Sequence, residues 1–258
     1  MATDAGLRPW WPAVESSPRW VRVRLGGAVV ADSRRALLYI QYGPGPLAGV
    51  YLPTYYLPAA DVRPGVLTDE VRDDERGVVS WTVRADGRRV ERAAWSHSAL
   101  PRELGRLADH VTFSWQRLDW YEEDERVVMH ARDPYKRVDV AVSSRHVRVE
   151  VAGQPLAESS RPLVLFETAL PVRYYLPRED VRLHLLRDST TETICPYKGT
   201  ARYWSAVVGG EVVEDVAWSY ETPIPENPRI AGLVCFANEK VDLVVDGERL
   251  PRPVTPWS

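Results

Sequence analysis

The chain has 258 residues, of which 45% are hydrophobic and 27% charged, and its formal net charge is −3 at pH 7. These values are typical of a soluble globular protein with one large or two ordinary domains. The slight acidity argues against a nucleic-acid-binding protein, which usually carries a basic stripe. No run of 18 apolar residues exists that would indicate a membrane-spanning helix.

The N-terminal segment, MATDAGLRPWWPAVESS (1–17), has paired tryptophans and prolines but no apolar stretch behind a basic segment. It does not resemble a secretory signal, and we expect an irregular arm that is either packed against the body or frayed. The chain has two cysteines, Cys195 and Cys235, so no disulfide framework is needed. A reduced, cytoplasmic environment is the default expectation.

The first half of the chain reads as short strands joined by turns. Residues 21–35 (VRVRLGGAVVADSRR) predict a hairpin that bends at Gly26-Gly27. Residues 55–62 (YYLPAADV) predict a strand that ends at a proline, followed by a single helical turn. The run RADGRRVER (84–92) holds four arginines, which at strand spacing predict a solvated face rather than a phosphate-binding track.

These elements occur twice along the chain. YYLPAADV (55–62) returns as YYLPREDV (174–181), and AAWS (93–96) returns as VAWS (216–219). The matches follow the same order in both halves, which predicts two homologous domains. The predicted organisation is an N-terminal arm (1–17), a first, diverged β domain (18–127), an ordered connector strand (128–144) and a second β domain (145–258).

The second half shows the strand pattern most clearly. In VRVEVAG (147–153) valines alternate with charged residues, which predicts a strand with one buried face and one solvent-exposed face. Residues 201–220 predict a hairpin with its bend at Gly209-Gly210. Short helices are expected at 101–108 and 225–232. The predicted fold class is mainly β, with two homologous compact β-roll or barrel domains and one or two short helices in each.

The segments SSRHVRVEV, LFETALPVRYYLP, CPYKGTARYW, VAWSY and NEKVDLVVDG resemble the bacterial family called domain of unknown function 427. The resemblance covers nearly the whole chain, is stronger in the second copy, and identifies a tandem two-copy member. It implies a roll similar to the β-tent fold and no established reaction, although the family also carries a nucleotidyltransferase-type label. Some β-tent proteins hold zinc in Cys-x-x-Cys knuckles, which this chain lacks, so we expect no metal and no cofactor.

The motif CPYKG (195–199) is the main candidate site, and it occurs only in the second copy. Lys198 has three interpretations: a lysine that shields a turn, a point charge for an anionic ligand, or a catalytic amine. In the last case desolvation among Tyr197, Tyr203 and Trp204 would lower its pKa, as in Schiff-base lysines. Cys195 is a second catalytic candidate, as a nucleophile, but a small buried core thiol is the favoured interpretation.

Trp204 and Trp218 lie at roughly equal distances from Gly209-Gly210, so we expect them to face each other across the hairpin. Such aromatic pairs often line small-molecule pockets. Because Trp81 and Trp95 repeat the pair in the first copy, core packing is the favoured role.

Charged residues also interrupt apolar runs. A buried carboxylate requires a partner, and either Arg173 or Lys198 would serve Glu167. Structural ion pairing is the competing interpretation. The predicted ligand-binding residues are Glu167, Arg173, Tyr175, Tyr197, Lys198, Tyr203, Trp204, Trp218 and Glu239.

The leading hypothesis is a cytoplasmic tandem β protein that binds a small anionic or aromatic ligand in its second domain. The first alternative is an enzyme that uses Lys198 or Cys195 on an activated carbonyl or phosphoryl substrate of the nucleotidyltransferase type. The second is a protein-interaction scaffold. We expect no nucleic-acid partner and no membrane partner, and the oligomeric state does not follow from the sequence.

Overall fold

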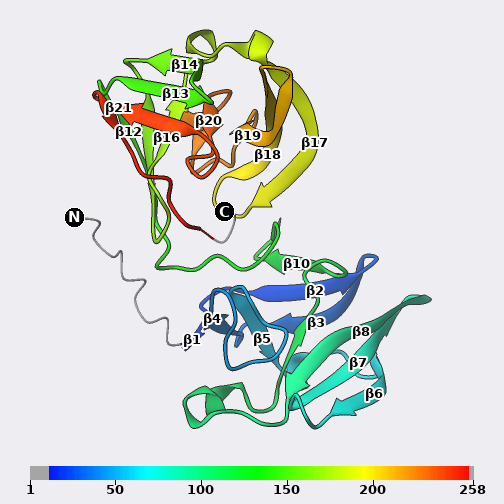
Figure 1. The fold of residues 1–258 in the computed structure, drawn as a ribbon. Helices are drawn as coiled ribbons and strands as arrows, with labels where there is room; N and C mark the ends of the chain where they lie inside the picture. Colours follow the sequence, from blue (N-terminus) through cyan, green and yellow to red (C-terminus); the bar gives the residue numbers. More distant parts are fainter. Residues whose placement is uncertain (1–11, 256–258) are drawn as a thin grey trace. The chain divides into compact units, whose positions relative to one another are not determined.

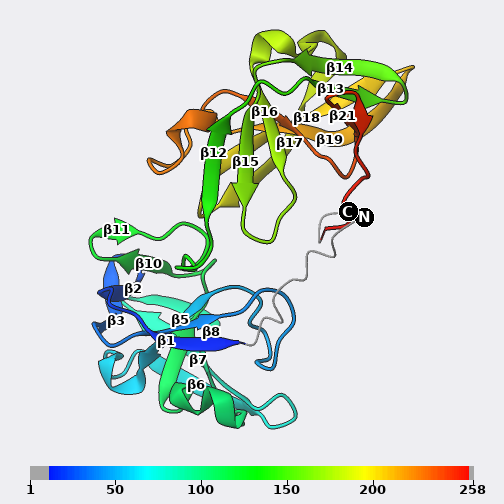
Figure 2. The ribbon, with the colours of Figure 1, turned by 90° about the vertical axis from the view of Figure 1, so that its left-hand side faces the viewer.

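The computed structural model describes residues 12–255, and the chain divides into two units, one ending at Asp133 and the other beginning at Pro134. Each unit contains a seven-stranded and a four-stranded sheet (Figure 1, Figure 2). All strand pairs are antiparallel, and the helical elements of the described residues are short 3-10 turns. The mainly β class is therefore confirmed.

The first unit orders its larger sheet β1-β4-β5-β9-β8-β7-β6 and its smaller sheet β11-β10-β2-β3. Its elements are β1 (Ala13–Ser16), β2 (Val21–Leu25), β3 (Ala28–Ser33), β4 (Leu37–Ile40), β5 (Thr54–Pro58), η1 (Ala59–Asp61), β6 (Leu67–Asp73), β7 (Val78–Ala85), β8 (Arg88–His97), η2 (Arg102–Leu107), β9 (His110–Phe113), β10 (Asp119–Glu122) and β11 (Glu125–Arg126).

The second unit orders its larger sheet β12-β15-β16-β20-β19-β18-β17 and its smaller sheet β14-β13-β21-β22. Its elements are β12 (Val138–Val142), β13 (Val147–Val151), β14 (Gln154–Ser159), β15 (Leu163–Glu167), β16 (Arg173–Leu176), η3 (Arg178–Asp180), η4 (Leu183–Leu185), β17 (Leu186–Cys195), β18 (Gly199–Val208), β19 (Glu211–Ser219), η5 (Pro228–Ile230), β20 (Val234–Phe236), β21 (Asp242–Val245) and β22 (Glu248–Arg249).

Taken in chain order, the strands of the larger sheet in the first unit have counterparts of the same connectivity in the second. Each unit begins with an edge strand of its larger sheet: β1 pairs with β4, and β12 pairs with β15. The strand β1 lies within the predicted arm, whose residues 1–11 are outside the described part of the chain, and β12 lies within the predicted connector. The prediction of two homologous β domains is confirmed by this shared topology.

The central strands of each larger sheet contribute to apolar clusters on both faces. One face packs on the smaller sheet, and the other forms a separate apolar cluster. In β16 the alternation of side chains sends Tyr174 and Leu176 toward the smaller sheet and Tyr175 toward the second cluster. We call this second face of the larger sheet in the second unit the outer face, and the candidate site lies on it.

The predicted turns are confirmed. Leu25 pairs with Ala28 around Gly26-Gly27. Val208 pairs with Glu211 around Gly209-Gly210, whose φ angles of +60° and +85° suit a two-residue hairpin turn. The prolines that end YYLP precede η1 and η3, and the two expected short helices contain η2 and η5.

The prediction that Trp204 and Trp218 face each other is wrong. Trp204 lies opposite Ala217, and Tyr203 lies opposite Trp218. A β-bulge between Trp204 and Ala206 shifts the register, with Asp215 of β19 at a φ of +52°. One residue of shift moves a side chain to the other face of the sheet, so the two tryptophans point in opposite directions.

No helix within residues 12–255 has the length and apolar composition needed to span a lipid bilayer.

Candidate functional site

The CPYKG motif forms the tight end of the β17–β18 hairpin. Cys195 pairs with Gly199, which leaves residues 196–198 as a three-residue loop. Gly199 has a φ of +107°, and a Cβ at this position would lie 3.3 Å from the backbone nitrogen of Ile224. Only glycine combines this backbone conformation with so close an approach, so the glycine fixes the loop against the segment that follows β19.

The same segment holds the loop by hydrogen bonds. The backbone N–H of Ile224 donates to the carbonyl of Lys198 at 3.1 Å. The Asn227 amide donates to the carbonyl of Tyr197 at 2.7 Å, and both residues of this pair are buried. The backbone that carries Lys198 is therefore fixed on two sides.

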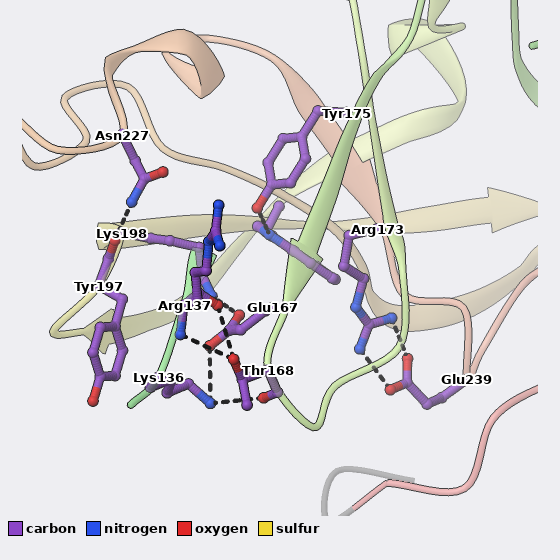
Figure 3. Close-up of polar contacts among 11 residues, drawn as sticks. Lys136, Arg137, Glu167, Thr168, Arg173, Tyr175, Tyr197, Lys198, Asn227 and Glu239 are labelled. Carbon is purple, nitrogen blue, oxygen red and sulfur yellow. Dashed lines mark hydrogen bonds and ion pairs between the residues drawn. The ribbon is translucent and has the colours of Figure 1, made fainter. Parts of the chain in front are cut away.

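Lys198 forms an ion pair and hydrogen bond with Oε2 of Glu167 at the end of β15 (Figure 3). Lys136 Nζ lies 3.2 Å from the other oxygen, Oε1, of the same carboxylate. The register between β12 and β15 places Val138 opposite Glu167, which brings the preceding residues of the chain to this carboxylate. The side chains of Lys136, Glu167 and Lys198 are 13%, 5% and 11% exposed, so the cluster is almost fully desolvated.

Burial acts to lower the pKa of the Lys198 amine, but Glu167 and Cys195 outweigh this effect and the pKa is raised. Lys198 is therefore an ammonium ion at neutral pH. This direction favours the interpretation of Lys198 as a point charge over that of a neutral, nucleophilic amine.

The two cysteines lie in different environments. Cys195 is half-buried and interacts with Lys198, so the expectation of a buried core thiol at this position is wrong. Cys235 is the buried thiol, and burial raises its pKa to about 12. Among the described residues, no group of three His, Cys, Asp or Glu side chains could hold a metal ion.

Arg173 and Glu239 form a second ion pair on the outer face. The two guanidinium nitrogens Nη1 and Nη2 lie 2.8 and 2.7 Å from the two carboxylate oxygens (Figure 3). Burial acts to raise the pKa of Glu239, but Arg173 more than offsets this and lowers it. Arg173 therefore pairs with Glu239 rather than with Glu167, the partner considered from the sequence.

Aromatic side chains connect neighbouring strands of the outer face. Tyr175 and Trp218 are both opposite Cys235 in the ladder, and Trp218 Nε1 donates to the Tyr175 hydroxyl at 3.3 Å. The rings of Tyr203 and Trp218 are 6.0 Å apart, and the Arg173 guanidinium lies 5.4 Å from the Trp218 ring. This row contributes to the apolar cluster of the outer face.

The structure thus brings eight of the nine predicted binding residues to the outer face or the loop beside it. Trp204 is the exception, because it shares the face of β18 that carries Ala206 and Val208 and packs on the core under the smaller sheet. Its indole N–H donates to Asp188 Oδ1 at 2.9 Å, and the Arg178 guanidinium lies 5.4 Å from its ring.

Sequence reasoning missed Lys136 and Asn227. Lys136 is one of only three lysines in a chain with 33 basic residues. That rarity was the available signal, because Lys198 is another of the three. Asn227 carried no such signal, since its role depends on a contact between separate loops.

The first unit replaces the charged residues of the outer face with neutral ones. The strand registers place Gln41 at the position of Glu167 and Thr54 at the position of Arg173. Gln116, three residues after Phe113, corresponds to Glu239, three residues after Phe236. The first unit therefore forms the same sheet without either buried ion pair.

A family model described as "Domain of unknown function (DUF427)" matches residues 13–124 and, a second time, residues 139–247. The two matched segments fall in the first and second structural units. A search of curated proteins found no match.

Proposed function

The chain belongs to the DUF427 family as a tandem two-copy member, and on this premise we propose that its second unit binds a small anionic ligand through Lys198. The family description names no reaction, so the proposal depends on the site itself.

The comparison between the two units carries this proposal. Burying paired charges costs desolvation energy, and neutral or apolar replacements are often equally stable. The first unit folds with Gln41 and Thr54 where the second has Glu167 and Arg173. Since the fold does not require these charges, their presence in the second unit supports a binding role.

The ammonium groups define the ligand class. Lys198 remains protonated, and Lys136 approaches the same carboxylate. A ligand carboxylate or phosphate would accept hydrogen bonds from these groups in place of, or beside, Glu167. The Tyr197 ring lies 5.7 Å from Lys136 Nζ, which supports a ligand with an apolar or aromatic part next to its anionic group.

Ligand screening by thermal shift tests this proposal. We expect small carboxylates or phosphorylated compounds that raise the Tm of the wild type and have no such effect on the Glu167→Gln/Lys198→Met double variant. This variant removes both charges together and leaves no unpaired carboxylate. Lys240→Ala is the matched control, because Lys240 is an exposed lysine of the same unit. An equal rise in Tm for the wild type and the double variant would remove Lys198 from the site.

A second candidate function is catalysis by Cys195, because this half-buried thiol interacts with the Lys198 ammonium. Cationic partners favour reactive thiolates. Incubation with activated acyl compounds followed by intact-mass measurement tests it: an adduct that Cys195→Ala abolishes supports acyl transfer, and its absence leaves binding as the function. Trapping with borohydride should give no adduct at Lys198, since its amine is protonated.

A further inference from the structure

The first unit contains a pocket that lies outside the site described above. Its volume is about 360 Å³, within the range of small-ligand pockets. It is formed by residues 63–66, which follow η1, and residues 84–89 at the tip of the β7–β8 hairpin. Its charged lining consists of four arginines and one acidic residue: Arg63, Arg84, Arg88, Arg89 and Asp86. We call it the arginine pocket.

Two of these arginines have no acidic partner. In the part of the chain that the structure describes, no carboxylate pairs with Arg63 or Arg88. The side chain of Arg88 lies directly over Gly26, where a Cβ would approach Arg88 Nε to 2.3 Å. The absence of a side chain at Gly26 therefore makes room for this guanidinium.

The positions of Arg84 and Arg89 are electrostatically unfavourable for the hairpin. Arg84 and Arg89 are directly opposite each other in the β7–β8 ladder, and like charges in this relation destabilise a hairpin. Asp69 of β6 lies 3.4 Å from Arg84 and 3.5 Å from Arg89, and Glu91 forms a second ion pair with Arg89. These two arginines are therefore compensated by two carboxylates, and the positive charge that favours an incoming anion comes from Arg63 and Arg88.

The second unit shows that the fold does not need these arginines. The ladder registers place Val207 and Val212 at the positions of Arg84 and Arg89, and Glu211 at the position of Arg88. The hairpin forms in both units. Arg84, Arg88 and Arg89 are thus a property of the first unit alone, whereas Arg63 has an equivalent in Arg182 of the second unit.

We infer that the arginine pocket is a separate anion site that binds the phosphate group of a small phosphorylated molecule. Guanidinium groups match phosphate oxygens through pairs of parallel hydrogen bonds. Gly65 and Gly87 line the same pocket, and both have positive φ angles of +79° and +76°, so the backbone there carries no side chain that would fill the space. The four arginines of residues 84–92 are exposed, as the prediction of a solvated face requires, and the proposed site adds a binding role to part of that face. The site is independent of the function proposed for Lys198.

Isothermal titration of the full chain with inorganic phosphate and pyrophosphate, at constant ionic strength, tests this inference. We expect one binding event in the wild type that is weakened at least tenfold in Arg63→Ala/Arg88→Ala. The matched control is Arg76→Ala/Arg102→Ala, which removes two exposed arginines outside the pocket and should bind as the wild type does. A second test variant, Arg84→Val/Arg88→Glu/Arg89→Val, copies the second unit's hairpin and should also lose binding while remaining folded by circular dichroism.

The Glu167→Gln/Lys198→Met variant separates this site from the one in the second unit, and it should retain phosphate binding. Binding that persists in Arg63→Ala/Arg88→Ala, or that disappears with the Lys198 variant, would overturn the inference, as would a wild type that binds neither probe. Fluorescence anisotropy with a single-stranded oligonucleotide distinguishes a nucleic-acid backbone from a small ligand. Oligonucleotide binding that is stronger than pyrophosphate binding and is lost in Arg63→Ala/Arg88→Ala would also overturn the small-ligand assignment.

Discussion

At the residue scale, the Glu167 carboxylate is 5% exposed and depends on lysine ammonium groups for its compensation. Lys198→Met removes one of the two cations beside it. Glu167 then keeps only Lys136 as a charged partner and loses a charge-assisted hydrogen bond in a desolvated site, so we expect the free energy of unfolding to fall by roughly 2 kcal/mol. Urea unfolding measures this loss.

The companion variant is the triple substitution Lys136→Met/Glu167→Gln/Lys198→Met, which removes all three charges and leaves a neutral site like that at Gln41 in the first unit. Its free energy of unfolding should return to within about 1 kcal/mol of the wild type. If the triple variant were as unstable as the single one, the charges would be essential to the fold and the argument for a binding role would fail.

His97 in the first unit gives the second prediction at this scale. Its Nε2 lies 2.8 Å from the Tyr56 hydroxyl, and burial lowers its pKa to about 4. In the unfolded chain a histidine binds a proton below about pH 6.5. The unfolded state therefore holds more protons between about pH 6.5 and 4, and stability must fall as the pH falls through this window.

The expected slope from His97 is at most about 1.4 kcal/mol per pH unit. Urea unfolding of the wild type and of His97→Gln at several pH values from about 7.5 to 4.5 isolates this contribution, because the carboxylates titrate equally in both. The wild type should lose more stability than the variant below about pH 6.5. Parallel pH curves would show that His97 titrates normally in the folded protein.

At the scale of the element, the β17–β18 hairpin depends on Gly199. Its φ of +107° and the 3.3 Å approach of a Cβ to the Ile224 nitrogen both oppose any side chain. Gly199→Ala should therefore cost about 2 kcal/mol of unfolding free energy. It should also weaken any ligand effect that depends on Lys198, because the loop can no longer pack on the segment behind it.

Gly209→Asn is the control for this substitution. Gly209 has a φ of +60°, a Cβ added there would meet no heavy atom within 4 Å, and asparagine tolerates this region well. Its cost should stay below about 1 kcal/mol. Equal losses for the two variants would mean that backbone conformation alone, and not the contact with Ile224, fixes the loop.

The hairpins also show what could be predicted from the sequence and what could not. The turn at Gly209-Gly210 was predictable because two adjacent glycines satisfy the positive φ angles of the turn. The bulge was not, since the positive φ is carried by Asp215, a residue that gives no comparable local signal. The prediction that paired Trp204 with Trp218 used only their roughly equal distances from the glycines, whereas an unbroken ladder would place Trp204 opposite Asp215 and the bulge places it opposite Ala217.

For the site, the sequence indicated buried charges but not their pairing. Glu167, Arg173 and Glu239 stand out because they interrupt apolar runs. Which of them meet depends on contacts between distant strands: β12 beside β15 brings Lys136 to Glu167, and the turn after β20 brings Glu239 to Arg173. Such contacts follow from the tertiary fold, which periodicity along the chain does not define.

At the scale of the whole molecule, duplication predicts that each unit has its own cooperative core. Leu57 in β5 and Leu176 in β16 are equivalent, and both are fully buried, in separate clusters. Truncation of either to alanine should cost about 2 to 5 kcal/mol, by lost burial and by the cavity that remains. If the cores are energetically separate, each substitution should destabilise only the unit that contains it.

Hydrogen exchange measured by mass spectrometry resolves this prediction peptide by peptide. Leu57→Ala should reduce amide protection in peptides from the first unit and leave the second unchanged, and Leu176→Ala should do the reverse. Loss of protection in both units from either substitution would show that they unfold together. Separate responses would mean that a substitution can alter the stability of one unit, and of the anion site proposed in it, without disturbing the other unit. Under that condition, two copies of one fold can acquire different charged residues.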